Sequence, residues 1–156
     1  MRLTITAISR IKAGPERDLI DDYLGRASAS GRSIGLGPAE ESEIDNRSLA
    51  NKTAESAALA ATVPDGARLC LLDERGKTQS SRAFSKTLCQ WRDEGAREAV
   101  FVIGGADGLD RSVFRQPDLT LSLGAMVWPH KLVRIMLAEQ LYRAVSIASG
   151  SPYHRD

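Results

Sequence analysis

Short apolar stretches recur along the chain at lengths that suit β-strands. At the N-terminus, apolar and polar residues alternate with a period of two, which is typical of a strand with two unlike faces. The later stretches are continuous apolar runs bounded by turn residues, as in strands that are buried on both faces. The predicted strands are residues 2–8, 67–72, 99–103 and 119–123.

Between these strands, apolar residues recur every three to four positions, which predicts helices. The serine- and glycine-rich segment 28–38 has no such period and is predicted to be a loop or poorly ordered. Four helices are predicted: one opening at Gly14-Pro15 with the apolar stripe Leu19, Ile20, Tyr23 and Leu24, an alanine-rich one over 46–62, one from Ser80 or Ser81 to Gly95 with Phe84, Leu88 and Trp91 on one side, and one over 129–148.

Strands that alternate with helices in this way predict βαβ units. The expected fold is therefore α/β, with a parallel-rich sheet and helices on both faces. Ligands of such sheets bind beyond the carboxyl ends of the strands. Three of those ends hold the most distinctive residues of the chain: Leu72-Asp73, Gly104-Gly105 and Leu123-Gly124.

The composition is that of a globular protein, with 42% hydrophobic and 26% charged residues in 156, and it suits a single domain over residues 1–156. The net charge of +1 gives no global argument for nucleic acid. With no signal-peptide pattern and no run of roughly 18 apolar residues, we expect a cytoplasmic protein that does not engage a membrane. Cys70 and Cys89 are interpreted as buried thiols, because two distant cysteines suit neither a disulfide framework nor a metal site.

A glycine-rich loop follows the predicted strand 99–103, with Gly104, Gly105 and Gly108 within five positions. Glycine lets a ligand approach the backbone without a Cβ in the way, although a Gly-Gly pair taken alone favours a simple tight turn. The loop lacks the spacing of a dinucleotide-binding fingerprint, and no Gly-Lys-Ser/Thr follows it. Dinucleotide redox chemistry and ATP hydrolysis therefore lose their usual support.

The apolar residues of the predicted helix 129–148 cover about 280° of its circumference, far more than one sheet face can bury. A homodimer partner is the economical explanation, since burial at the centre of so small a monomer is less expected. Glu139 and Arg143 are four residues apart in the favourable order and are interpreted as a structural pair.

The last third of the chain also holds a modest basic cluster and both histidines, His130 and His154. On charge alone, the basic cluster is as consistent with a solvated helix face as with a nucleic-acid surface. The tail 151–156 contains Tyr153, His154 and Arg155, groups that stack on bases and bind phosphate. A frayed terminus is the alternative interpretation.

Taken in order, several segments resemble the SPOUT-class methyltransferases, and among them the small bacterial 23S rRNA (pseudouridine-N3)-methyltransferases. The resemblance covers almost the whole chain and is highly specific as an ordered set. It rests on Leu71-Leu72-Asp73-Glu74-Arg75-Gly76-Lys77, Phe101-Val102-Ile103-Gly104-Gly105-Ala106-Asp107-Gly108-Leu109, Leu121-Ser122-Leu123-Gly124-Ala125-Met126-Val127-Trp128-Pro129-His130, Leu132-Val133-Arg134, Leu137-Ala138-Glu139-Gln140-Leu141-Tyr142-Arg143-Ala144 and the ending Pro152-Tyr153-His154-Arg155.

The resemblance implies a C-terminal trefoil knot that holds S-adenosylmethionine, and a homodimer with the active site near the subunit interface. Matching by position assigns the cofactor to Leu72, Gly104, Gly105, Leu123, Gly124, Ala125, Met126, Val127 and Trp128. Here Ala106-Asp107 stands where many members have Pro-Glu, and Trp128 is bulkier than the usual aliphatic residue.

Methyl transfer from a sulfonium needs no metal, because the leaving group is already good and the work is alignment and exclusion of water. By resemblance the target is N3 of a pseudouridine in 23S rRNA, and this nitrogen must lose a proton. We expect the assembled ribosome to be the substrate, with free rRNA or a ribosomal subunit as the alternatives. The catalytic candidates are His130, His154, Arg155 and Tyr153, and the RNA-binding candidates are Lys131, Arg134, Tyr142 and Arg143. The alternative function is a non-catalytic RNA-binding or ribosome-associated module of the same fold.

Overall fold

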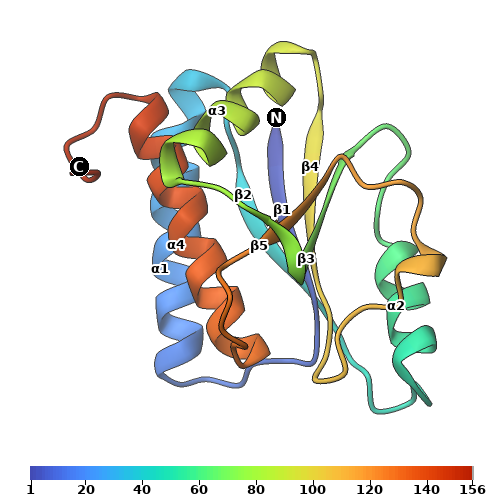
Figure 1. The fold of residues 1–156 in the computed structure, drawn as a ribbon. Coiled ribbons are helices and arrows are strands. Elements are labelled where there is room, and N and C mark those ends of the chain that lie inside the picture. The colour runs from blue at the N-terminus through green and yellow to red at the C-terminus, as the bar shows by residue number, and fades with distance from the viewer. Residues whose placement is uncertain (156) are drawn as a thin grey trace.

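The computed structural model describes residues 1–155 and has a parallel β-sheet at its centre (Figure 1). All neighbouring strands run parallel, in the order β2-β1-β4-β3-β5. The strands are β1 (Arg2–Ile8), β2 (Ala39–Ile44), β3 (Arg68–Thr78), β4 (Glu98–Ile103) and β5 (Leu119–Ser122). The helices are α1 (Pro15–Gly31), α2 (Lys52–Ala60), α3 (Ser81–Asp93) and α4 (His130–Ala148), with 3₁₀ turns at Arg32–Ile34 and Arg111–Val113.

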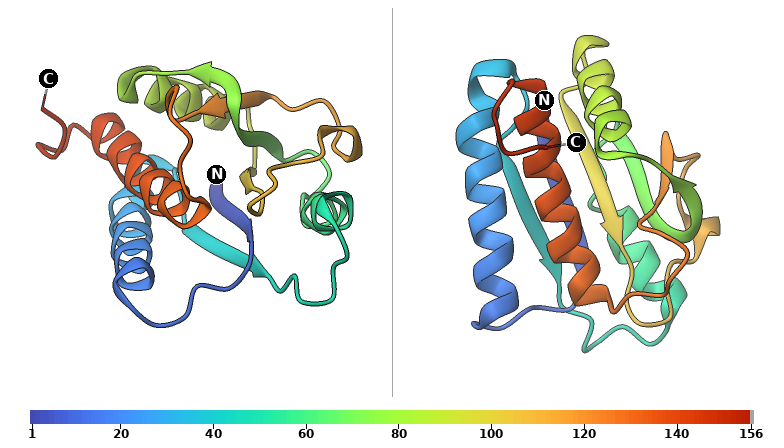
Figure 2. Two further views of the ribbon diagram at one scale, coloured as in Figure 1. Left: turned by 60° about the horizontal axis from the view of Figure 1, so that its bottom comes forward. Right: turned by 60° about the vertical axis from the view of Figure 1, so that its left-hand side comes forward.

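Helices cover both faces of the sheet, which confirms the predicted fold class. Helices α1, α3 and α4 lie on one face, and α2 with the second 3₁₀ turn lies on the other (Figures 1 and 2). Alternate residues of β4 divide between two cores. Phe101 and Ile103 pack under α1, α3 and α4, whereas Val100 and Val102 pack on the α2 side. Burial on both faces explains why this strand is a continuous apolar run.

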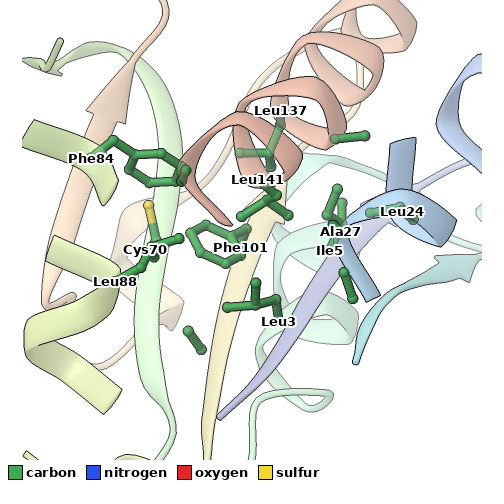
Figure 3. Close-up of a cluster of buried hydrophobic side chains, with 14 of the residues drawn as sticks. Leu3, Ile5, Leu24, Ala27, Cys70, Phe84, Leu88, Phe101, Leu137 and Leu141 are labelled. Carbon is green, nitrogen blue, oxygen red and sulfur yellow. The ribbon is translucent and has the colours of Figure 1, made fainter. Parts of the chain in front are cut away.

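The larger core is built around Phe101, which is fully buried (Figure 3). Its ring meets Phe84 of α3 edge-on, with the centroids 6.0 Å apart. Leu137 and Leu141 of α4 pack beside it in the same cluster. Cys70 of β3 is buried there as predicted, and burial raises the pKa of its thiol, whereas Cys89 is only partly buried.

The expected loop over 28–38 is wrong for most of its length. Helix α1 continues to Gly31 and a 3₁₀ turn follows it. The Ser28 hydroxyl exchanges hydrogen bonds with the backbone of Ala39, at 3.0 Å to its carbonyl and 2.8 Å from its N–H. Serine is a poor helix former in isolation, but here contact with the neighbouring strand decides the local structure.

Strand β2 was not predicted, because its sequence Ala-Glu-Glu-Ser-Glu-Ile has little apolar content. It pairs with β1 at the edge of the sheet. Its carboxylates are compensated by arginines: Glu41 by Arg17 at 2.5 Å, and by Arg134 at 2.7 Å. An acidic edge strand is compatible with a sheet once its charges are paired.

Two element boundaries also differ from the prediction. Helix α2 begins at Lys52, with the Asn51 side chain accepting the N–H of Ala54, so residues 46–50 precede the helix. Strand β3 extends to Thr78 across an irregularity in which Leu72 and Lys77 both pair with Leu121. A Cβ on Gly76 would lie 2.7 Å from the Thr120 carbonyl oxygen, so glycine permits the close approach to β5.

Helix α4 packs against α1 on one side and α3 on the other, over the sheet (Figure 2). Its residues Leu137, Ala138, Leu141, Ala144 and Val145 are all buried within the chain. The width of its apolar surface is therefore explained largely without a partner subunit.

None of the helices within residues 1–155 combines the length and hydropathy needed to span a lipid bilayer.

Two glycines of α1 provide a matched test of the tight backbone contact at the end of this helix. A Cβ on Gly31 would lie 1.6 Å from the Leu36 carbonyl oxygen, so we expect Gly31→Ala to lower the free energy of unfolding by about 2 kcal/mol or more. A Cβ on Gly25 would meet nothing within 4 Å, so Gly25→Ala should raise it by about 0.5–1 kcal/mol. Urea denaturation of both variants measures the difference, and equal effects would contradict the tight contact at Gly31.

Candidate active site

The carboxyl edge of the sheet brings together the ends of β1, β2 and β4. The two glycines after β4 serve different purposes there. A Cβ on Gly104 would lie 2.6 Å from the Gly108 carbonyl oxygen, so this glycine permits a tight turn. A Cβ on Gly105 would instead lie 2.7 Å from Oε2 of Glu55 and 3.4 Å from Ile8. Gly105 therefore permits a carboxylate from α2 to approach the loop.

Glu55 was not singled out from the sequence, where it reads as an ordinary acidic residue in the first turn of a helix. Its carboxylate accepts a hydrogen bond of 2.6 Å from the Asn46 amide, which in turn accepts one of 3.1 Å from the Ser9 hydroxyl. Ser9 follows β1 and Asn46 follows β2. No local sequence signal marks this chain of contacts, because its members are brought together only by the sheet.

The segment after β5 runs along the surface into α4. The Ser122 hydroxyl donates to the Gly124 carbonyl at 2.9 Å and shapes the turn. Met126 and Val127 are 70% and 80% exposed, and Trp128 is 38% exposed. Large apolar side chains at this exposure form a surface suited to a ligand or to another macromolecule.

Leu123 and Gly124 border a groove of about 480 Å³ that is lined by α1, α3 and α4. Its apolar wall includes Leu19 and Tyr23 of α1 together with Ile135 and Met136 of α4. Gly104, Gly105 and Leu72 do not line this groove, and Leu72 is largely buried in the core. The cofactor residues predicted from the sequence are thus spread over the edge of the sheet rather than gathered in one cavity.

His130 is the first residue of α4 and is partly buried. Burial lowers the pKa of its imidazole, and the positive charges of Arg134 and Lys131 lower it further, while Glu55 acts in the opposite direction. The ring is therefore neutral at pH 7, the state in which an imidazole can accept a proton. Its electrostatic contact with Glu55 places it at the same edge as the glycine loop.

The tail packs back on α4 and is not frayed over its described part. The Tyr153 hydroxyl donates to Glu139 at 2.9 Å, and its ring lies 4.5 Å from that of Tyr142 and 4.8 Å from the Arg143 guanidinium. Arg143 also reaches His154 Nδ1 at 3.3 Å and pairs with Glu139 at 2.5 Å, which confirms the structural role expected of that pair. Burial and the Glu139 carboxylate raise the pKa of Tyr153, so its hydroxyl is a hydrogen-bond donor and not a base.

Comparison with known proteins identifies the family of the chain. A family model described as "Predicted SPOUT methyltransferase" matches residues 1–154. The chain belongs to the SPOUT methyltransferase family. Proteins from Maricaulis maris and Dinoroseobacter shibae, both named "Ribosomal RNA large subunit methyltransferase H", are 66% and 54% identical to it over 156 and 155 residues, covering 99% or more of each chain. A protein of the same name from Roseobacter denitrificans is 53% identical over the full length of both chains.

Membership of the SPOUT family implies the use of S-adenosylmethionine, and the carboxyl edge fits this cationic cofactor in two respects. Gly105 has no side chain, so its backbone lies directly beside the Glu55 carboxylate. Glu55 also makes no ion pair with any residue in the described range 1–155, so its charge is available to a ligand. Gly105 and the exposed residues 125–128 are among the cofactor residues expected from the sequence, and they would hold the cofactor at this edge.

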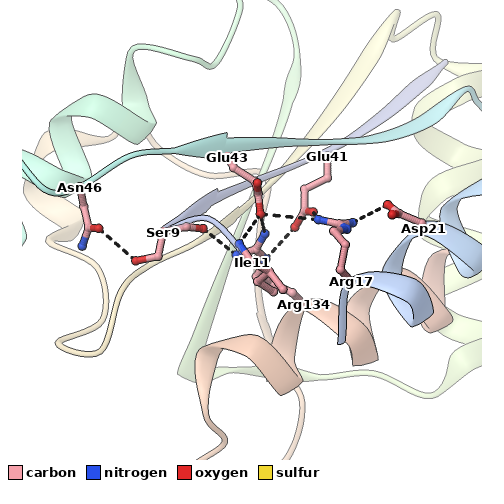
Figure 4. Close-up of polar contacts among 8 residues, drawn as sticks. All are labelled: Ser9, Ile11, Arg17, Asp21, Glu41, Glu43, Asn46 and Arg134. Atoms are coloured by element: carbon pink, nitrogen blue, oxygen red, sulfur yellow. Dashed lines mark hydrogen bonds and ion pairs between the residues drawn. The ribbon is translucent and has the colours of Figure 1, made fainter. Parts of the chain in front are cut away.

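One RNA-binding candidate is corrected by the structure. The Arg134 side chain is completely buried and donates to Glu41, Glu43 and the Ser9 carbonyl (Figure 4). It has no exposed atoms to offer a phosphate, so its basic character belongs to the interior. Tyr142 and Arg143 are engaged with the tail, whereas Lys131 and Arg155 are exposed.

The lowered pKa of His130 gives a direct prediction. Because the folded state disfavours the imidazolium, stability should fall as the pH is lowered through the ordinary histidine value near 6.5. The chain has only two histidines, so NMR titration can follow both. We expect the His130 ring to titrate below pH 6.5 in the wild type, with His130→Ala identifying its signal. A midpoint at or above 6.5 would contradict the buried, cation-flanked placement.

Proposed function

We propose that this SPOUT protein uses S-adenosylmethionine to methylate N3 of a pseudouridine in 23S rRNA, on the assembled ribosome, in the cytoplasm. The observation that carries this proposal is the full-length likeness, at up to 66% identity among the relatives compared, to proteins named as ribosomal RNA large subunit methyltransferases. The trefoil knot of the last third of the chain stays a prediction of family membership.

The chain has side chains suited to each task of the reaction. When bound, S-adenosylmethionine supplies a methyl group on a cationic sulfur that leaves readily. His130 is neutral at pH 7, so one of its ring nitrogens can accept the N3 proton of the pseudouridine. Arg155 is an exposed permanent cation that can stabilise the deprotonated ring. Tyr153, whose hydroxyl stays protonated, can stack on or orient the base.

These catalytic candidates do not meet within one chain. His130 opens α4, while the tail is fixed to Glu139 nine residues later, which corresponds to about 14 Å along a helix. This separation leaves the proton acceptor and the tail at different parts of α4 within one chain. We therefore propose a homodimer in which the tail of one subunit completes the site beside the glycine loop of its partner, as the family resemblance also implies.

The homodimer predicts the mass in solution. Sedimentation equilibrium at micromolar concentration should give about twice the monomer mass of 16.9 kDa. In a mixture of His130→Ala and a tail-deleted variant, each inactive by itself, exchange of subunits should restore one intact site and part of the activity. A single 16.9 kDa species across the micromolar range, or no restored activity in the mixture, would contradict the shared site.

Deletion of Tyr153 to Asp156 tests the role of the tail; Asp156 itself lies outside the described residues. We expect methylation to be abolished while affinity for S-adenosylmethionine falls much less, because the proposed cofactor contacts lie in earlier loops. A phosphate contact alone would cost about 1 kcal/mol and could be overcome by saturating RNA, whereas a lost catalytic group could not.

Single-turnover methylation of ribosomes by the wild type, the truncation, His154→Ala and Arg155→Ala gives the measurement, with calorimetry for cofactor affinity. Near-normal rates of the truncation at saturating ribosome would show the tail to be dispensable. RNA binding by the wild type without any binding of S-adenosylmethionine would instead favour the non-catalytic RNA-binding module.

A further inference from the structure

The most informative feature outside the predicted site residues is the carboxylate of Glu55. It comes from α2, which lies on the face of the sheet opposite α4 (Figure 1). The carboxylate reaches the glycine loop at the carboxyl edge. Its Oε2 lies 2.7 Å from the position that a Cβ on Gly105 would occupy. Even an alanine at position 105 would force this carboxylate to move.

A chain of hydrogen bonds fixes the orientation of the Glu55 carboxylate. The Ser9 hydroxyl donates to Asn46 Oδ1 (Figure 4), so the Nδ2 group of Asn46 faces the other way and donates to Glu55 Oε1 at 2.6 Å. The Ser9 carbonyl is in turn held by Arg134 at 2.8 Å. One carboxylate oxygen is thus occupied by a neutral amide, and the other is the oxygen that lies against Gly105.

Glu55 is not required for the structure of its own helix. The N-terminus of α2 is capped by Asn51, whose side chain accepts the Ala54 N–H at 2.9 Å. Helix α2 is fixed to the loop after β4 by other contacts, from Thr53 to the Asp110 carboxylate and from the Asp110 N–H to Ser56. The Glu55 carboxylate thus caps no helix N–H and makes no ion pair within residues 1–155, so its Oε2 can serve a ligand.

The two cations that act on His130 together with Glu55 make no ion pair with this carboxylate. Arg134 and Lys131 both act on His130 electrostatically, as Glu55 does, which places the three side chains around one ring. However, the Arg134 guanidinium is engaged by Glu41, Glu43 and the Ser9 carbonyl, and Lys131 is exposed. The carboxylate therefore lacks a charge-assisted partner of its own, although such partners give the strongest hydrogen bonds.

We propose that Glu55 is a cofactor-binding residue, whose Oε2 accepts a hydrogen bond from S-adenosylmethionine at the Gly104–Gly105 loop. This inference rests on the proposed methyltransferase function. The donor on the cofactor is a ribose hydroxyl or the ammonium of its amino-acid part. Within residues 1–155 the Asn46 amide donates to Oε1, which leaves Oε2 to accept a hydrogen bond from the cofactor. Gly105 and Glu55 then act as one unit, in which the missing side chain of one makes room for the carboxylate of the other.

Calorimetry on the full chain tests this inference with two ligands. S-Adenosylhomocysteine has both the ribose and the ammonium, whereas 5′-methylthioadenosine keeps the ribose and lacks the amino-acid part. We expect Glu55→Gln to weaken S-adenosylhomocysteine about tenfold or more, as for loss of a charged hydrogen bond. An equal loss for 5′-methylthioadenosine assigns the bond to the ribose, and an unchanged affinity for it assigns the bond to the ammonium.

The matched control is Glu16→Gln, the same change in the first turn of α1 on the other face of the sheet, which should leave both affinities unchanged. Glu55→Asp keeps the charge but withdraws it by one methylene, and it should lower affinity even if the glutamine variant folds poorly. Binding by both Glu55 variants within twofold of the wild type would overturn the role of Glu55 alone. Failure of the wild type to bind either ligand would overturn both this inference and the proposed function.

Discussion

The buried guanidinium of Arg134 is the interaction on which the arrangement of this protein depends. It is fully buried, yet it reaches three acceptors from two neighbouring strands: Glu41 and Glu43 of β2, and the carbonyl of Ser9, which directly follows β1 (Figure 4). Arg17 of α1 compensates Glu41 from the other side. Removing one partner from such a network typically costs about 3–5 kcal/mol, because charges are left buried without compensation. The pairing of Arg134 with Glu41 and Glu43 therefore fixes the position of α4 and also compensates the charges of the acidic edge strand β2.

The same network is continuous with the proposed cofactor edge. Although burial opposes ionisation, the hydrogen bond from the Ile11 N–H and the pairing with Arg134 lower the pKa of Glu43, so it stays charged. Ser9, whose φ of +71° is unusual for a residue other than glycine, directs its carbonyl to Arg134 and its hydroxyl to Asn46. Local strain of this kind persists where the surroundings fix it, often beside functional sites. Through Asn46, the ionic core of the protein is connected to the carboxylate of Glu55.

The last helix divides the catalytic candidates between its two halves. Its N-terminus holds His130 at the edge of the sheet, and its middle holds the tail through Glu139, Tyr142 and Arg143. Within a single chain the two groups of candidate residues are thus separated along a rigid helix. This separation is a stronger argument for the proposed homodimer than the broad apolar surface of α4, because that surface is buried largely within the chain.

Sequence alone determined the features that depend on local patterns. The alternating and continuous apolar runs located four of the strands, and the period of the helices gave the α/β fold, because burial on one or two faces leaves a direct record in residue order. The ordered motifs identified the family. Tertiary structure decided the remaining features. Strand β2 is acidic and forms only because distant arginines neutralise it, and Ser28 is helical only because β2 lies beside it. Arg134 looked like a surface cation, and Glu55 looked like an ordinary first-turn acid, because a charged residue carries no local mark of the partners that fold around it.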